Sequence, residues 1–345
     1  MALRSLVLQD FRRYDQMRFD FDPQVNLIWG SNARGKTSVL EAVYLLTIGR
    51  SFRTSQLKDL IRKGADSFHV HLTFVKHGVE QVIRFSYNGK EYRVLHNQTQ
   101  YRSPAAVLGI LQGVVVTPDD ASLVKDSPSI RRRFLDAQIA QVDPLYVHHL
   151  MRYMRSMKQR NALLKARNLG SIETWEQQMA VAAEYITKQR SVVVQDLSRM
   201  AQSYYGNLSE ETDLFQIQFP SELRSADEYL KKYNKHRSRE MDLGFTLVGP
   251  HKDDILMMIG DKEARHFASE GQQRSCVAAL RLAEWERLRT LADESPIMLY
   301  DDVGMSLDDS RKDRLFRFLE NLDQVFLTST QDLNFGDRNC HRITV

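Results

Sequence analysis

The sequence has few cysteines and no long apolar run. Only Cys276 and Cys340 occur among its 345 residues, too few and too late in the chain for a disulfide framework, and they lack the close spacing of a metal site. The N-terminal stretch carries Arg4, Asp10 and Arg12 where a signal peptide would have its apolar core. No apolar run approaches membrane-spanning length. We therefore expect a soluble, cytoplasmic protein in a reducing compartment, with no membrane association.

Acidic residues are absent from one stretch and crowded in another, although the formal net charge is only +4. No Asp or Glu occurs from His148 to Arg167. The cations of this basic stretch are Arg152, Arg155, Lys158, Arg160, Lys165 and Arg167. The crowded acids are Asp301, Asp302, Asp308 and Asp309. The basic stretch could neutralise phosphates without reading sequence, or it could be a solvated helix face.

Hydrophobic patterning divides the chain into three parts. The first is rich in expected strands, with an apolar run at Val25–Trp29 and alternating apolar residues over 68–74. From Ile130 to Tyr205 the apolar spacing predicts two or three long helices. Strand-like segments return at 245–248, 255–259, 297–300 and 325–328, with a helix expected over 272–291. We predict an α/β head in residues 1–128 and 243–345, interrupted by a helical lobe in residues 129–242.

The segment GSNARGKT matches the P-loop pattern G-x-x-x-x-G-K-[ST]. It lies between the apolar run and an expected helix over 38–48, which is the context that a P-loop requires. Glycines at both ends let the backbone bring N–H groups onto phosphate oxygens, while the lysine reaches the terminal phosphates and the threonine binds Mg²⁺. The predicted nucleotide site comprises Gly30, Ser31, Asn32, Ala33, Arg34, Gly35, Lys36 and Thr37. The motif predicts binding of a nucleoside triphosphate, most simply ATP.

A second apolar run, Ile297–Tyr300, is followed directly by two acids, Asp301 and Asp302. A strand end of this kind is needed to hold Mg²⁺, so Asp301 is the expected metal ligand together with Thr37. Asp302, one residue further, is expected to orient or deprotonate the attacking water, which makes it a catalytic candidate beside Lys36. Alternatively, the two acids only cap the next element.

The segment Ser269-Glu270-Gly271-Gln272-Gln273 opens the expected helix over 272–291 and resembles the signature segment of ABC-type ATPases. In that class the signature contacts the γ-phosphate held by the partner subunit, so ATP becomes part of a dimer interface. Ser269, Gly271 and Gln272 are therefore predicted to bind nucleotide across a dimer. The competing interpretation is a plain helix N-cap by Ser269.

Further segments make the resemblance more specific, because the chain resembles the RecF family of bacterial recombination mediators over nearly its full length. They follow the order of that family, a member of the SMC-like ATPase group. The segments are Leu8–Tyr14, the P-loop with Leu40–Leu46, Gly49–Thr54, Pro118–Asp120, Leu123–Lys125, Arg131–Asp136, Gly249–Asp254 and Gly271–Arg274. The resemblance implies an ABC/SMC-type P-loop ATPase head with an inserted helical lobe.

This family resemblance also implies how the protein works. Two subunits would close around DNA when ATP binds and reopen after slow hydrolysis, with Arg12 and Arg53 near the nucleotide. The implied partners are single-stranded and duplex DNA at gap junctions, a second copy of the chain, and RecR, which acts with RecO to load RecA. No histidine stands near 328–330 where transporters place their switch histidine, which agrees with slow hydrolysis.

The sequence departs from the family in a few places. Ala33 and Arg34 replace P-loop glycines, which costs backbone freedom. Met305 and Ser306 stand where the family has a dimer-contacting serine and acid, which puts dimer communication in question. Gln112 precedes its strand, so we assign no Q-loop residue.

Three other functions are compatible with parts of the pattern. An ATPase subunit of an ABC transporter would share the P-loop, signature and acidic strand, but not the long basic helical insertion. A metabolic kinase would not need the signature helix. A DNA-binding scaffold with a vestigial ATP site would lack ATP-dependent dimerisation.

Overall fold

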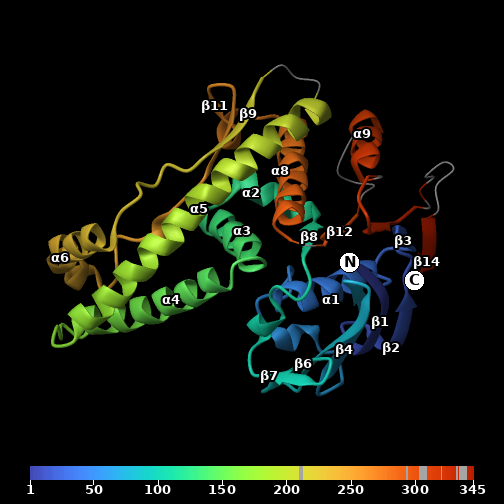
Figure 1. Cartoon of the computed structure of the whole chain (residues 1–345), viewed down its shortest axis with the longest axis horizontal. Helices are drawn as coiled ribbons and strands as arrows, with labels where there is room; N and C mark the ends of the chain where they lie inside the picture. Colours follow the sequence, from blue (N-terminus) through green and yellow to red (C-terminus); the bar gives the residue numbers. More distant parts are fainter. Residues whose placement is uncertain (210–212, 293, 303–308, 320, 332, 334–339) are drawn as a thin grey trace. The chain divides into compact units, whose positions relative to one another are not determined.

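The structure is a computed structural model that describes residues 1–209, 213–292, 294–302, 309–319, 321–331, 333 and 340–345. The chain forms two compact units (Figure 1). The head unit is Met1–Ala121, Ser203–Thr212 and Ser269–Val345, and the helical unit is Ser122–Gln202 and Asp213–Ala268. These boundaries differ from those predicted after residues 128 and 242. Segments 122–128 and 243–268 belong to the helical unit because they pack and form ion pairs within it.

One sheet of the head unit is antiparallel and has six strands. In spatial order β2-β1-β4-β5-β6-β7, these are Tyr14–Asp20, Ala2–Phe11, Phe68–Lys76, Val79–Tyr87, Tyr92–His96 and Thr99–Tyr101. Apolar and polar residues alternate along β4, so Phe68, Val70, Leu72 and Phe74 are buried on one face. The alternation predicted over 68–74 is confirmed.

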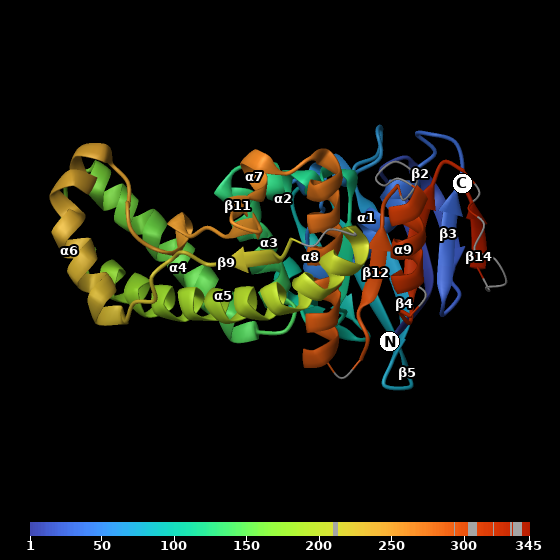
Figure 2. The same ribbon diagram turned by 90° about the horizontal axis from the view of Figure 1, so that it is seen from above.

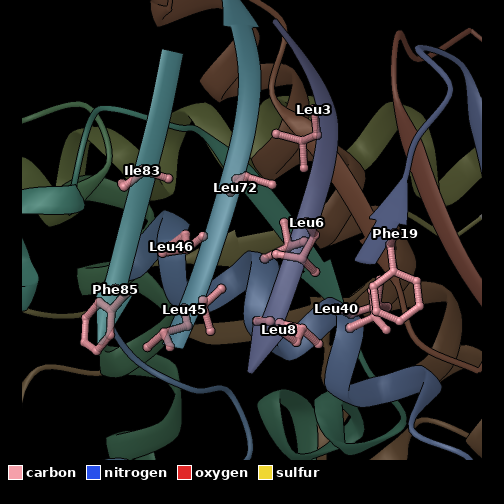
Figure 3. Close-up of a cluster of buried hydrophobic side chains, with 14 of the residues drawn as sticks. Leu3, Leu6, Leu8, Phe19, Leu40, Leu45, Leu46, Leu72, Ile83 and Phe85 are labelled. Atoms are coloured by element: carbon pink, nitrogen blue, oxygen red, sulfur yellow. The ribbon is translucent and has the colours of Figure 1, made fainter. Parts of the chain in front are cut away.

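The helix α1, Lys36–Ile48, packs against the buried face of this sheet. Figure 3 shows Leu40, Leu45 and Leu46 of α1 facing apolar side chains of β1, β4 and β5. The same core cluster includes residues of a second sheet, among them Phe326 and Leu299. Because α1 is buried on nearly all sides, its sequence is apolar all round rather than amphipathic. This burial fixes where the helix begins, which is also where the P-loop ends.

The second sheet of the head unit has five strands, all parallel. In the order β14-β3-β13-β12-β8 they are Cys340–Thr344, Val25–Trp29, Val325–Ser329, Ile297–Tyr300 and Gly113–Val116. Buried parallel strands read as continuous apolar runs, and β8, β12 and β13 are buried throughout. Because the strands are parallel, the carboxyl ends of β3, β12 and β13 meet at one edge.

The described part of the head unit contains further helices besides α1. They are the 3₁₀ helices η1 (Leu57–Leu60), η2 (Pro104–Val107) and η3 (Pro118–Ala121), and the α-helices α8 (Glu270–Leu291) and α9 (Asp309–Leu319). The helix predicted over 272–291 is confirmed as α8. Arg281 of α8 forms a bidentate ion pair with Asp120 of η3 at 2.7 and 2.9 Å, which fixes α8 to the end of β8.

The helical unit is built mainly from long helices (Figure 2). The longer ones are α3 (Pro128–Ala140), α4 (Pro144–Lys165), α5 (Ile172–Ser209, whose last residues count with the head) and α6 (Ala226–Leu243). Short helical turns are α2 (Ser122–Lys125), η4 (Pro250–Lys252) and α7 (Ala264–Phe267). A small sheet, β11-β10-β9, joins Lys262–Glu263, Leu256–Ile259 and Phe215–Gln218. The predicted long helices and the strand at 255–259 are confirmed. The strand predicted at 245–248 is wrong, because this segment is an irregular connection that follows the left-handed Gly244 at the end of α6.

A buried ion-pair network ties three helices of this unit together. Arg160 of α4 is fully buried and donates to Glu176 of α5 at 2.9 Å and to Glu240 of α6 at 2.6 Å. Its third nitrogen donates to the hydroxyl of Thr246 at 2.9 Å. This cation of the basic stretch is therefore structural and cannot contact phosphate, whereas Arg152, Arg155 and Lys158 of the same helix are exposed.

The Gly249–Asp254 segment is held inside the helical unit by arginines. Arg131 of α3 pairs with Asp254 at 2.7 Å, and Arg190 of α5 pairs with Asp253 at 3.0 Å. His251 bonds to the hydroxyl of Tyr153 at 2.6 Å and to a backbone carbonyl at 3.0 Å, and burial lowers the pKa of His251 to about 4. This histidine is a neutral structural residue.

None of the helices that the structure describes is long and apolar enough to span a bilayer. Within the same residues, no group of three or more His, Cys, Asp or Glu side chains is placed to hold a metal ion.

Candidate functional site

The predicted P-loop connects β3 to α1, as the sequence indicated. Gly30 and Gly35 have φ angles of 153° and 107°, a region that strains any residue with a Cβ atom. A Cβ at Gly30 would overlap the carbonyl oxygen of Val345, so this position also requires a close backbone approach. Ala33 has φ 62°, a left-handed conformation that costs a non-glycine residue about 1–2 kcal/mol. The departure at Ala33 therefore places backbone strain inside the loop.

Lys36 lies at the first position of α1 and turns back into the loop. Its Nζ donates to the carbonyl oxygens of Gly30 at 2.7 Å and of Ser31 at 2.9 Å, and the side chain is 9% exposed. An ammonium needs oxygen partners when it is buried, and these carbonyls provide them. Phosphate oxygens offer stronger, charge-assisted bonds at the same place. The lysine is thus held where a nucleotide in the loop would meet it.

Thr37 and Asp301 meet although 264 positions separate them in the chain. The Thr37 hydroxyl donates to Oδ1 of Asp301 at 2.9 Å. Two neighbouring ligands of an octahedral Mg²⁺ with bonds of about 2.0–2.1 Å lie about 3 Å apart, which is the spacing of this pair. A hydroxyl and a carboxylate are also the oxygen ligands that Mg²⁺ prefers. The two residues therefore fit the predicted metal site.

Thr328, at the end of β13, completes this cluster. Its hydroxyl donates to Oδ1 of Asp301 at 2.7 Å and accepts from the backbone N–H of Asp302 at 2.7 Å. Asp301 is 6% exposed, and burial raises the pKa of its carboxyl, while the hydrogen bonds from Thr328 and Thr37 oppose that rise. Asp302 has φ 55°, which aspartate tolerates better than most residues. Sequence reasoning gave Thr328 no role, because its signal is only a hydroxyl at a strand end.

Arg12 has taken a partner other than the predicted nucleotide. It forms a bidentate pair with Glu41 of α1 at 2.6 and 2.8 Å, and donates to the carbonyl of Asp59 at 2.8 Å. Glu41 is fully buried and also accepts a hydrogen bond from Ser51. Arg53 lies 3.9 Å from the same carboxylate. In this arrangement Arg12 anchors α1 through its pair with Glu41. The contact of Arg12 with nucleotide stays a prediction.

The two residues after Arg12 lie closer to the loop, and sequence reasoning missed them. A Cβ at Gly35 would lie 2.6 Å from the hydroxyl of Tyr14 and 2.8 Å from Cδ of Arg13. The Tyr14 hydroxyl is buried and has no hydrogen-bond partner among the described residues. Burial raises the pKa of Tyr14 to about 12, so the hydroxyl stays protonated and can donate. The turn between β1 and β2 therefore forms a wall of the P-loop.

We expect Gly35→Ala to weaken ATP binding by tenfold or more. The added methyl would have to adopt φ 107° and displace Tyr14 and Arg13, and the backbone strain alone costs about 1–2 kcal/mol. Titration with a fluorescent ATP analogue measures the change. Gly64→Ala is the matched control, because Gly64 has φ 91° but nothing within 4 Å of the added atom. Unchanged affinity in Gly35→Ala would show that nucleotide does not need this wall.

The predicted signature residues lie at the start of α8. The Ser269 hydroxyl accepts from the backbone N–H of Gln272 at 3.2 Å, and the Gln272 side chain accepts from the backbone N–H of Ser269 at 2.8 Å. This reciprocal pair is a capping box, so the helix N-cap interpretation of Ser269 is confirmed. Ser269 is exposed, and Gly271 and Gln272 are half-buried. The predicted contact with a partner's nucleotide remains open, and Met305 and Ser306 lie outside the described residues.

Comparisons with known proteins agree with this geometry. Residues 2–341 match the family model described as RecF/RecN/SMC N terminal domain. The chain is 50% identical over 338 residues to a protein of Protochlamydia amoebophila named DNA replication and repair protein RecF, covering 96% of this chain and 94% of that one. A Chlamydia trachomatis protein of the same name is 34% identical over 337 residues, covering 96% and 92%.

Solved structures give the same match. A structure described as the recombination mediator protein RecF-ATP in the RecFOR pathway superposes with a TM-score of 0.91 at 29% identity, covering 99% of this chain and 95% of that one. The Smc head domain of Pyrococcus furiosus, bound to the C-terminal domain of ScpA, has a TM-score of 0.56 at 18% identity, covering 96% and 90%. That second likeness concerns the fold alone.

Proposed function

Because the chain belongs to the RecF family of DNA replication and repair proteins, we propose that it is an ATP-dependent, DNA-binding recombination mediator. The head unit has the fold of an ABC/SMC-type ATPase head, with the helical unit inserted into it. One observation carries the proposal. The parallel sheet brings the P-loop residues Lys36 and Thr37 together with the acidic strand end at Asp301.

The residues of this site divide the work of binding and hydrolysing ATP. The N–H groups of the P-loop and the ammonium of Lys36 would hold the phosphates, and Thr37 and Asp301 would hold Mg²⁺. Bound Mg²⁺ would neutralise charge on the phosphates. Asp302 orients the attacking water from its position beside β13. Thr328 helps to give the two acids different roles. Its hydroxyl donates to the side chain of Asp301 but accepts from the backbone N–H of Asp302.

Hydrolysis serves as a switch in this proposal. The ATP site of one head is completed by Ser269, Gly271 and Gln272 of a second copy. ATP therefore binds the closed dimer more tightly than the monomer and stabilises the dimer. DNA, single-stranded or duplex and at gap junctions, favours the same state when it contacts both copies. Turnover is slow and is stimulated by DNA. The protein acts in the cytoplasm with RecR and assists RecA loading at gapped DNA.

The solution mass tests this switch directly. We expect a dimer at low salt only with ATP, more of it when duplex DNA is added, and monomer with ADP or without nucleotide. A protein that binds ATP but stays monomeric under every condition contradicts the switch and leaves an ATP-binding scaffold. Binding to DNA should weaken steeply with salt, because phosphate contacts release counterions.

Ser269→Arg is expected to remove the ATP-dependent dimer and leave ATP affinity nearly unchanged. The arginine would fill the space where the partner's phosphate must approach the start of α8. Sedimentation gives the mass and titration gives the affinity. Ser225→Arg is the matched control, since Ser225 forms the same capping box at the start of α6 and its loss costs a similar amount, about 1 kcal/mol. If Ser269→Arg dimerises like the wild type, Ser269 serves only as a helix cap.

A further inference from the structure

The edge of the antiparallel sheet that is formed by β6 and β7 carries a shallow groove with several cations. A hollow of about 570 Å³ is lined by Lys90, Tyr92, Arg93, Gln100, Tyr101 and Arg102, together with Glu91. A second hollow of about 260 Å³ continues it toward β4, lined among others by His69 and Ser86. The two share Arg93 and Glu91. We call the two hollows together the β6–β7 groove.

Two arginines lie side by side in this groove. Val94 of β6 pairs with Tyr101, the last residue of β7, and Arg93 and Arg102 are the neighbours of this last pair on the two segments. The hydroxyl of Tyr92 donates to the carbonyl of Arg102 at 3.2 Å, which confirms how close the two segments lie. Like charges at facing positions are destabilising unless a counter-charge lies between them.

The cations of the groove have no acid partner in the part of the chain that the structure describes. Lys90, Arg93 and Arg102 are exposed, and no carboxylate lies within 4.0 Å of any of them among those residues. Glu91 lines both hollows but makes no such pair, and it leaves a local excess of positive charge. An anionic ligand would therefore remove a repulsion that the protein itself leaves unbalanced.

The polar side chains form a line across the sheet. Arg102 and Arg93 are followed by Ser86, which pairs with Arg93, and by His69, which pairs with Ser86. Buried neighbours such as Phe85 and Val94 point to the other face, so this line belongs to the outer face of the sheet. Strands are spaced about 4.8 Å apart, so the line is about 14 Å long. A linear polyanion fits such a line better than a single phosphate does.

We propose that the β6–β7 groove is a second DNA site, which binds the phosphodiester backbone of single-stranded DNA without ATP. The choice of DNA as the polyanion rests on the proposed function. Guanidinium groups bind phosphate bidentately, and Arg93 and Arg102 provide two exposed guanidinium groups along this groove. In the sheet order, β6 and β7 lie at the end opposite to β2, whose Tyr14 contacts the P-loop. Occupation of the groove is therefore independent of the nucleotide site.

Oligonucleotide binding by the full chain tests this site. We compare the wild type with the triple variant Lys90→Gln/Arg93→Gln/Arg102→Gln, using the fluorescence anisotropy of a short labelled thymidine oligonucleotide without nucleotide. We expect the variant to lose tenfold or more in affinity. The slope of log affinity against log salt should become shallower by about 2, since each phosphate contact on a single strand contributes about 0.7.

Two controls separate this site from the rest of the protein. Arg18→Gln removes an exposed cation at the opposite end of the same sheet, where it pairs with Asp20, and should leave oligonucleotide affinity unchanged. Far-UV circular dichroism of the triple variant should match that of the wild type, which shows that it folds. The Lys36→Met variant should bind the oligonucleotide as the wild type does, so failure of the ATP switch would not touch this measurement.

Two results would overturn the proposal. The first is equal oligonucleotide affinity and salt slope for the wild type and the triple variant. The second is displacement of the oligonucleotide by polyglutamate of equal charge at equal concentration, because an acidic peptide would then be the better description of the ligand.

Discussion

Lys36→Met is expected to reduce ATP turnover by about 100-fold or more and to abolish the ATP-dependent dimer. The Nζ of Lys36 donates to two loop carbonyls, at 2.7 and 2.9 Å, and is the one cation held inside the P-loop of the described structure. Methionine fills similar space without the charge, so the phosphates lose a charge-assisted partner in a buried site. Loss of one such donor typically costs about 10²–10³ in rate.

Phosphate release measures turnover for this variant, and sedimentation with ATP measures the dimer. Lys58→Met, which removes an exposed lysine of η1, should behave as the wild type in both. Far-UV circular dichroism checks that Lys36→Met is folded. Wild-type turnover in the folded variant would mean that the P-loop does not bind the nucleotide that is hydrolysed.

Arg160→Met is expected to destabilise the helical unit by about 3–5 kcal/mol. Arg160 is fully buried between Glu176 and Glu240, so its removal leaves buried Glu240 without a cation and Glu176 with Arg237 alone. The aliphatic replacement keeps much of the packing against the ring of Tyr233, which lies 5.1 Å from the guanidinium carbon. The loss in free energy of unfolding therefore measures the removal of the charge rather than the creation of a cavity.

Urea unfolding followed by far-UV circular dichroism measures this loss, because the helical unit contains most of the long helices. Arg167→Gln is the matched control at the end of the same stretch of cations. Its pair with Asp242 has side chains that are 69% and 70% exposed, and such surface pairs contribute about 0–1 kcal/mol. A change below about 1 kcal/mol in Arg160→Met would contradict the structural role of the network.

Much of the fold could be predicted from local patterns. The alternation along β4 and the continuous apolar runs of β3 and β12 distinguish a half-buried strand from fully buried ones. The helices of the helical unit were predicted from a stretch, residues 130–205, that has apolar residues at helical spacing and only one glycine and one proline, Gly170 and Pro144. The irregular segment 245–248 has the apolar composition of a strand but no neighbour to pair with in the described structure, and composition does not report pairing.

The charge of a stretch proved a poor guide to its role. Arg160 looks like its neighbours Arg155 and Lys158 in sequence, yet it is buried and they are exposed. Only one face of α4 lies against α5 and α6, and Arg160 is on that face. Its acid partners, Glu176 and Glu240, come from other parts of the chain. Likewise Arg12 and Arg13 are adjacent, and only the structure shows that Arg12 pairs with Glu41 while Arg13 lies against Gly35.

The sequence by itself determined the P-loop, because its residues are contiguous and its two glycines, lysine and threonine are required by the geometry of phosphate binding. It also determined the acidic strand end, because an apolar run followed by two acids is a local pattern. Only the tertiary structure decided that Asp301 bonds to Thr37 and Thr328, since that meeting depends on the parallel register of three strands far apart in the chain. The β6–β7 groove likewise exists only through the pairing of β6 with β7, which brings Arg93 and Arg102 to the lining of one hollow.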